Sequence, residues 1–202
     1  DHTTVAISPT FKFSTKQEQL KGSFSIRSAI FDEIKLINRA TQEEKLFHFK
    51  GGGGYSRGGD AFFFEADLRS SDIYLTLFCE KSKRLDHFQT SLDLSVLSSH
   101  AFEPFYKLPA EMSFDLKAHS EGPWSSLYGK GSHPIDGVIE LNVRKPETFQ
   151  FASHFSLYPD RSWNLSHLAI LSPFIQLQGS AQFTGDGLPK TIYTTVSIPD
   201  FS

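Results

Sequence analysis

The residues best suited to chemistry are the eight histidines, the single cysteine Cys79 and the carboxylates. Metal ligands that share one element usually stand two residues apart on a strand or four apart on a helix. No two histidines have either spacing. One cysteine also excludes an internal disulfide and a cysteine-based zinc site. The sequence therefore predicts no metal site and no cofactor.

The serines and carboxylates do not indicate a catalytic site either. The chain lacks the G-x-S-x-G elbow of serine hydrolases. Asp93, Asp115 and Glu140 alternate with apolar residues, which places them on the polar side of strands. A glycosidase needs two carboxylates that face one cleft, and nothing in the sequence selects such a pair. We expect a protein without catalytic residues, and an enzyme of unrecognised type stays a third hypothesis.

The glycine-rich stretch Gly51–Gly59 and the charge balance bear on phosphate binding. The stretch lacks the lysine and hydroxyl of a phosphate-binding loop, and no helix start follows it, so it predicts a flexible hairpin tip. Lys and Arg number 20 against 23 Asp and Glu, for a formal charge of -3. Because no basic stripe is present, we expect no nucleic-acid partner.

Apolar and polar residues alternate along most of the chain, as is typical of strands with one apolar face. Turn residues recur at roughly ten-residue intervals, and the 20 phenylalanines favour strands over helices. About a dozen strands fit, and a sheet of that size has to curl or split into layers. The clearest runs are Phe62 to Leu68, Ile73 to Cys79, Leu92 to Val96, Ile139 to Val143 and Ile175 to Phe183.

Helices are expected to be few. Only Glu43–Phe47 and Ser95–Tyr106 could be helical, and neither shows two full turns of helical periodicity. The absence of strand-helix-strand alternation argues against parallel folds. The expected fold is all-β and antiparallel, either a long curled sheet that forms an open U-shaped groove or a closed β sandwich or jelly roll. The alternation is the same in both.

Two stretches resemble the AsmA/TamB group of bacterial envelope proteins. In that family a D-L-x-x-L element precedes an alternating strand and a return strand that begins at a glycine turn. The matching residues are Ser91–Leu97, Met112–Ala118 and Gly122 in the first stretch, and Ser162–Ile170, Leu177–Ser180 and Ile198–Phe201 in the second.

The resemblance implies a β-taco, a long groove with an apolar inner face and a polar outer face. Such proteins span the periplasm from an inner-membrane anchor, and they move phospholipid between membranes or assist outer-membrane protein assembly. We therefore expect residues 1–202 to be a single β domain, cut from a longer repetitive protein that is periplasmic and tethered to the inner membrane. Expected partners are phospholipid or another apolar ligand and an outer-membrane barrel protein, with membrane contact through missing parts of the parent chain.

The apolar face supplies the candidate site. Acyl chains would lie against the side chains that point into the groove, and no catalytic residue is needed. The rival hypothesis is a β sandwich that binds carbohydrate or protein through its loops, with Tyr55 and Arg57 in the glycine-rich stretch. The lipid-groove candidates are Phe24, Ile26, Phe62, Phe64, Leu75, Leu77, Phe114, Leu116, Ile139, Leu141, Phe149, Phe151, Ile175 and Leu177.

Overall fold

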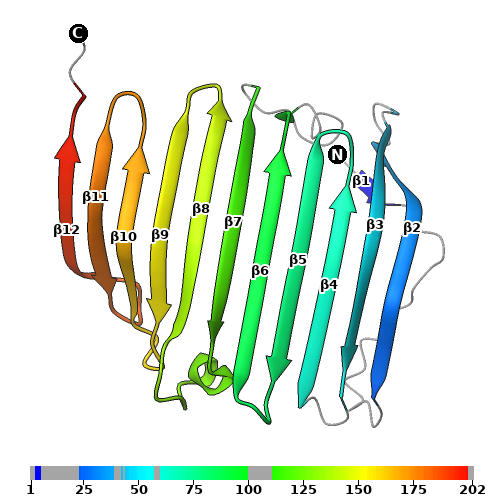
Figure 1. Ribbon diagram of the computed structural model, residues 1–202, viewed down its shortest axis with the longest axis horizontal. Coiled ribbons are helices and arrows are strands. Elements are labelled where there is room, and N and C mark those ends of the chain that lie inside the picture. Colours follow the sequence, from blue (N-terminus) through cyan, green and yellow to red (C-terminus); the bar gives the residue numbers. More distant parts are fainter. Residues whose placement is uncertain are drawn as a thin grey trace.

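The computed structural model describes residues 3–5, 23–38, 42, 44–56, 60–99 and 111–199. Within these residues, twelve strands form one antiparallel sheet in which neighbours follow chain order (Figure 1). A short 3₁₀ helix, η3 (Trp124–Tyr128), follows β7 at the lower edge of Figure 1, and we call this edge the η3 end of the sheet. The strands are β1 (Thr3–Val5), β2 (Phe24–Asn38), β3 (Glu44–Tyr55), β4 (Ala61–Arg69), β5 (Ile73–Ser82), β6 (His87–Val96), β7 (Ser113–Gly122), β8 (Ile135–Lys145), β9 (Phe149–Leu157), β10 (Trp163–Leu171), β11 (Gln176–Phe183) and β12 (Pro189–Ser197).

Short turns explain why consecutive strands pair. Asp86, Arg161 and Gly187 have φ angles of 47°, 66° and 83° in the turns after β5, β9 and β11. Left-handed residues of this kind let the chain reverse within a few positions. Each reversal sets the next strand beside the previous one, so the strands follow chain order. The predicted antiparallel meander is confirmed.

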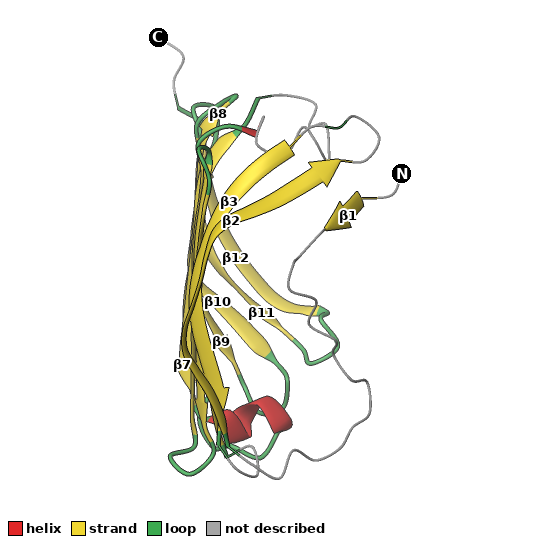
Figure 2. Ribbon diagram, turned by 90° about the vertical axis from the view of Figure 1, so that its right-hand side faces the viewer, coloured by secondary structure: helices red, strands yellow, loops and turns green. Residues whose placement is uncertain are grey.

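The sheet is a single bowed layer. Figure 2 looks along the row of strands, and β2, β3 and β10 to β12 bend toward the same side. Strand pairing is regular from β3 to β7, whereas the β2–β3 register shifts near Ile26 and the β9–β10 register shifts after Ser166. Bulges bend and twist a strand, which accounts for the curl at both flanks. The predicted long, curled and open antiparallel sheet is confirmed.

The alternative of a closed sandwich or jelly roll is wrong. The described residues form one sheet, and no second sheet packs on it. Few apolar side chains in this part of the chain are fully enclosed, whereas a sandwich buries the whole inner face of each sheet. Phe47 and Ile73 form the centre of a small core away from the η3 end. The buried apolar residues are Phe47, Ala66, Ile73, Val96, Ile135 and Ala181.

The helix expected at Glu43–Phe47 is wrong, because residues 44–47 belong to β3. Their pairing with neighbouring strands overrides a weak local helix preference. In the second segment, Ser95 and Val96 are the last residues of β6, and residues 100–106 lie outside the described residues. A helix in that segment therefore stays a prediction beyond Val96.

The glycine-rich stretch differs from the predicted hairpin tip. Gly51 to Gly54 lie inside β3, and Gly51 pairs with Ala29 of β2 and Ala66 of β4. A Cβ atom at Gly51 would come within 2.7 Å of the Phe49 ring, so the glycine leaves room for that ring to lie along the strand. Pairing on both sides therefore holds these residues extended. Residues 57–59 of the stretch lie outside the described part.

Gly137 is one of the points at which the sheet needs a glycine. A Cβ atom there would stand 2.3 Å from the ring of Phe155 on the neighbouring strand and 2.6 Å from the carbonyl oxygen of His119. We predict that Gly137→Ala lowers the free energy of unfolding by about 2 kcal/mol because the ring and the backbone must move. Denaturant titration measures the change, with Gly53→Ala as the control because its nearest contact is at 3.2 Å. Equal stability of the two variants would contradict the prediction.

Candidate functional site

An unbroken apolar row crosses the sheet. Each strand from β2 to β12 contributes one large apolar residue, and each residue is the direct cross-strand partner of the next. Direct partners in an antiparallel sheet lie on the same face. The whole row therefore lies on one face. Its members are Phe31, Phe49, Leu68, Leu75, Leu94, Leu116, Leu141, Phe151, Ile170, Leu177 and Val196.

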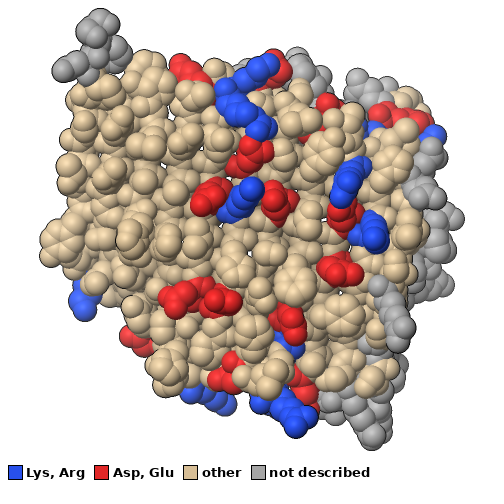
Figure 3. All heavy atoms as spheres, in the orientation of Figure 1, with Lys and Arg blue, Asp and Glu red and all other residues tan. Residues whose placement is uncertain are grey.

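The opposite face is polar. The residues next in sequence to those of the apolar row form a second cross-strand row, which points to the other face. From β3 to β8 this row consists of charged and hydroxyl side chains. Figure 3 shows acidic and basic side chains over these strands on the face toward the viewer, which is the convex face in Figure 2. The apolar row therefore lines the concave face. The polar row contains Lys50, Asp67, Thr76, Asp93, Lys117 and Glu140.

The structure brings nearly all the predicted groove residues together. Alternation and cross-strand register place the residues from β2, β4, β5, β7, β8, β9 and β11 on the concave face. Ile175 lies in the turn before β11, and the side chain of Phe24 is outside the described part of the chain. The residues placed on the concave face are Ile26, Phe62, Phe64, Leu75, Leu77, Phe114, Leu116, Ile139, Leu141, Phe149, Phe151 and Leu177.

The concave face is open rather than packed. Ile26, Phe62 and Phe64 expose 39%, 41% and 39% of their surface, and most of the apolar row is only half-buried. Apolar residues of a packed sheet face are usually almost fully buried. The exposure here therefore leaves a continuous apolar surface available for a ligand.

Two further cross-strand rows lie beside the apolar row, on its η3 side. In the first row the small residues Ala66, Ala118 and Ser153 are interrupted by Leu77, Leu92 and Ile139. The second row contains Thr90 and Ser120. Small and large side chains therefore mix on the surface next to the apolar row.

Cys79 lies in the second of these rows, between Phe64 and Thr90. The thiol is half-buried, and this burial raises its pKa above the ordinary value of 9.0. Cysteine reacts as the thiolate, so the thiol is a slow nucleophile at neutral pH. It is suited to reporting whether the concave face is covered rather than to covalent chemistry.

The η3 end of the concave face carries an aromatic cluster. Trp124 of η3 lies 5.9 Å from Phe88 and 5.1 Å from Tyr128 between ring centroids. Asp86 fixes η3 to the sheet, because the Ser125 backbone N–H and hydroxyl donate to its carboxylate at 2.7 and 2.6 Å. These two hydrogen bonds lower the pKa of Asp86 below 3.8. The Nζ atom of Lys81 stands 4.1 Å above the Trp124 ring.

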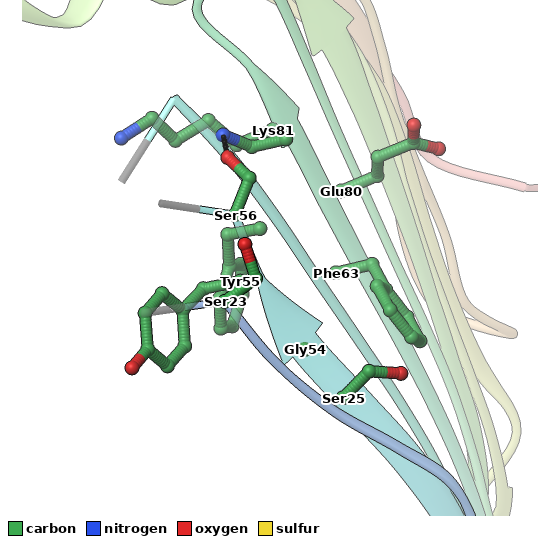
Figure 4. Close-up of a pocket in the computed structure, with 10 residues that line it drawn as sticks. Ser23, Ser25, Gly54, Tyr55, Ser56, Phe63, Glu80 and Lys81 are labelled. Carbon is green, nitrogen blue, oxygen red and sulfur yellow. Dashed lines mark hydrogen bonds between the residues drawn. The ribbon is translucent and has the colours of Figure 1, made fainter. Parts of the chain in front are cut away.

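A cavity of about 400 Å³ adjoins this cluster at the ends of β2 to β5. Figure 4 shows Lys81 and Tyr55 on one side of the strands, with Phe63 and Glu80 on the other. The Ser56 hydroxyl accepts a hydrogen bond of 2.7 Å from the Ala61 backbone N–H, which closes the β3–β4 connection. The cavity therefore combines apolar walls with hydroxyl groups, Lys81 and the carboxylate of Glu80.

Polar side chains on the convex face join neighbouring strands. Asp115 accepts hydrogen bonds from Ser95 and Arg144 across β6, β7 and β8 on the convex face. Asp93 and Glu140 lie on the same face, as predicted. In the described part of the chain, no group of three His, Cys, Asp or Glu could hold a metal ion. None of the described helices is long and apolar enough to cross a membrane.

The chain matches no family model, no curated protein and no solved structure. The AsmA/TamB resemblance therefore remains an expectation from the sequence, and the site is defined by its geometry alone.

Sequence reasoning missed Lys81 and Trp124 at the η3 end. Lys81 occupies the concave position that follows Leu77 and Cys79 in β5, so it interrupts an apolar alternation that was otherwise recognised. Trp124 lies in a 3₁₀ helix after β7, and no strand periodicity covers it. The break in alternation at Lys81 was the one available signal.

Proposed function

We propose that this chain is a non-catalytic groove segment that binds or conducts lipid acyl chains along its concave face. The observation that carries the proposal is the unbroken apolar row from β2 to β12, exposed on the concave side of a sheet whose convex side is polar. Each methylene group that an acyl chain buries against such a surface contributes about 0.8 kcal/mol to the free energy of binding. No reacting group is required for that role.

The dimensions of the row suit several acyl chains. It crosses ten strand-to-strand steps from β2 to β12, and at about 4.8 Å for each step it is roughly 48 Å long. The acyl region of one leaflet is roughly 15 Å thick, half of a hydrocarbon core of about 30 Å. About three acyl chains could therefore lie end to end along the row. Equivalent neighbouring positions favour movement along the sheet over capture at one point.

The cellular setting follows from the AsmA/TamB resemblance and is part of the proposal. In the parent protein the segment would extend a periplasmic groove tethered to the inner membrane. Phospholipid is the proposed ligand, carried between inner and outer membranes. The open curled sheet supports this setting because a closed sandwich would have no exposed concave face.

The reactivity of Cys79 tests the proposal. We predict that saturating phospholipid slows alkylation of Cys79 by a maleimide at least about fivefold, because an acyl chain on the concave face excludes the reagent. The rate is measured by mass spectrometry at fixed pH. The control is the double variant Cys79→Ser, Gln89→Cys, which moves the only thiol to the convex face. Equal protection at both positions would indicate aggregation around lipid rather than a ligand on the concave face.

Outer-membrane protein assembly is a second candidate function, and the edge strand β12 favours it. Among the described residues, β12 pairs only with β11. It exposes 56% of Ile192, 70% of Tyr193 and 55% of Val196. A long apolar edge can receive another strand through main-chain hydrogen bonds. Ile192→Lys should block strand addition, as edge lysines do, while Cys79 protection by lipid stays unchanged.

A further inference from the structure

Lys81 is an unusual charge on the concave face. Its cross-strand partners are Phe62 and Phe88, and its Nζ atom lies 4.1 Å above the Trp124 ring. The side chain is half-buried. The aromatic ring attracts the ammonium group without neutralising its charge. A positive charge is therefore held at the η3 end of an otherwise apolar strip.

The other charges at concave positions between β3 and β8 are neutralised. From β3 to β8, the charged residues at concave positions of the described strands are the lysines Lys45, Lys81 and Lys145. Lys45 pairs with Asp72 at 2.6 Å, and Lys145 pairs with Glu111 at 3.1 Å. No ion pair joins Lys81 to a carboxylate among the described residues, and Glu80 points to the opposite side of β5 (Figure 4). Lys81 thus differs from both in having no anionic partner there.

The surroundings of Lys81 suit an anion attached to an apolar chain. The cavity of about 400 Å³ at this end is lined by Lys81, Phe62 and the hydroxyl-bearing residues Tyr55 and Ser56. Phe63 and Glu80, which point to the opposite side of the strands, also line the cavity. The smaller residues Cys79 and Thr90 stand in the next cross-strand row on the concave face. Lysine binds carboxylate and phosphate groups as a compact point charge with three donors.

We propose that Lys81 binds the carboxylate or phosphate head group of an amphiphile whose acyl chain lies on the concave face. This inference rests on the proposed function, because it needs the acyl chain to occupy that face. The ligand would then enter or leave at the η3 end with its charged group at the edge of the sheet. Lys81 would select anionic amphiphiles over neutral ones.

The test compares ligands that share one tail and differ in head group. Binding of hexadecanoate, hexadecyl phosphate and neutral monohexadecanoylglycerol is measured by isothermal titration below their micelle concentrations. We expect the two anions to bind the native chain about tenfold more tightly than the neutral ligand, as a partly desolvated charge pair allows. Lys81→Met should reduce that preference to within about twofold, while affinity for the neutral ligand is retained.

Two further variants keep the result interpretable. Lys83→Met removes an exposed lysine that pairs with Asp60 at 3.7 Å, and it should keep the anion preference. Lys81→Arg should restore most of the preference that Lys81→Met loses. Circular dichroism confirms that each variant is folded. An unchanged preference in folded Lys81→Met overturns the role of Lys81.

The remaining outcomes separate this inference from the proposed function. If the neutral and anionic ligands bind the native chain equally well, the proposed function stands and the head-group site is overturned. If none of the three ligands binds, the proposed function itself fails. The last ligand tested is inorganic phosphate. If it binds at Lys81 as tightly as hexadecyl phosphate does, the anion does not come from a lipid and the inference is overturned.

Discussion

Replacing Phe151 by aspartate should weaken acyl-chain binding by more than about tenfold while the chain remains folded. Phe151 lies in the middle of the apolar row, between Leu141 and Ile170. A carboxylate there keeps its water in the open state, and a bound acyl chain would have to strip that water away. Such desolvation without a partner costs several kcal/mol, which exceeds the gain from the few methylenes that contact one strand. Equilibrium binding of a fluorescent phospholipid measures the loss.

The matched control is Gln150→Asp. Gln150 is the preceding residue of β9 and pairs with Asn142 and Leu171 on the convex face. The Gln150→Asp substitution introduces the same charge one position away from Phe151→Asp, so changes in net charge or solubility affect both variants alike. We expect phospholipid binding to Gln150→Asp to match that of the native chain. Equal losses in the two folded variants would show that the ligand does not distinguish the faces.

The second large effect separates the core from the ligand surface. Phe47 exposes 6% of its surface and packs with Ile73, whereas Phe64 exposes 39% on the same face. We predict that Phe47→Ala lowers the free energy of unfolding by about 3 kcal/mol, because it leaves a cavity in the small core. Phe64→Ala should cost about 1 kcal/mol, because that ring already contacts solvent. Denaturant titrations of the two variants measure the difference.

The same pair reports on binding. Phe64→Ala should weaken phospholipid binding severalfold despite its small effect on stability, because the exposed ring supplies contact area to the ligand. A Phe64→Ala variant as unstable as Phe47→Ala would indicate that Phe64 is buried core in solution. The concave face would then be covered, and the groove assignment would be wrong.

The faces of the sheet could be predicted from the sequence. Alternation such as Leu75, Leu77 and Cys79 assigns side chains to one face without any knowledge of strand partners. The turn residues after β5, β9 and β11 then give the order of the strands. The predicted groove residues that lie in described strands, and whose side chains are described, consequently all lie on the concave face. The predicted groove residues did not include Leu92, Leu94 and Phe155, which follow the same alternation onto that face.

The alternation of residues alone could not decide between an open curled sheet and a closed sandwich. An alternating strand in a sandwich and one in an open groove have the same pattern, and the choice depends on bulges near Ile26 and Ser166. The extended conformation of Gly51 to Gly54 was also missed. Their pairing with β2 and β4 is a non-local contact, and it overrides the turn preference of glycine. The position of Trp124 over Lys81 likewise depends on hydrogen bonds from Ser125 to a distant turn.

The central claim is that the concave face is an open apolar surface that holds acyl chains. Native mass spectrometry of the purified chain tests it most directly, with lipid extraction on the same sample. The groove predicts copurified phospholipid on the native chain and on Gln150→Asp, and its loss from folded Phe151→Asp. A native chain without lipid, together with unfolding of Phe151→Asp, would show that these side chains form a buried core and would contradict the groove.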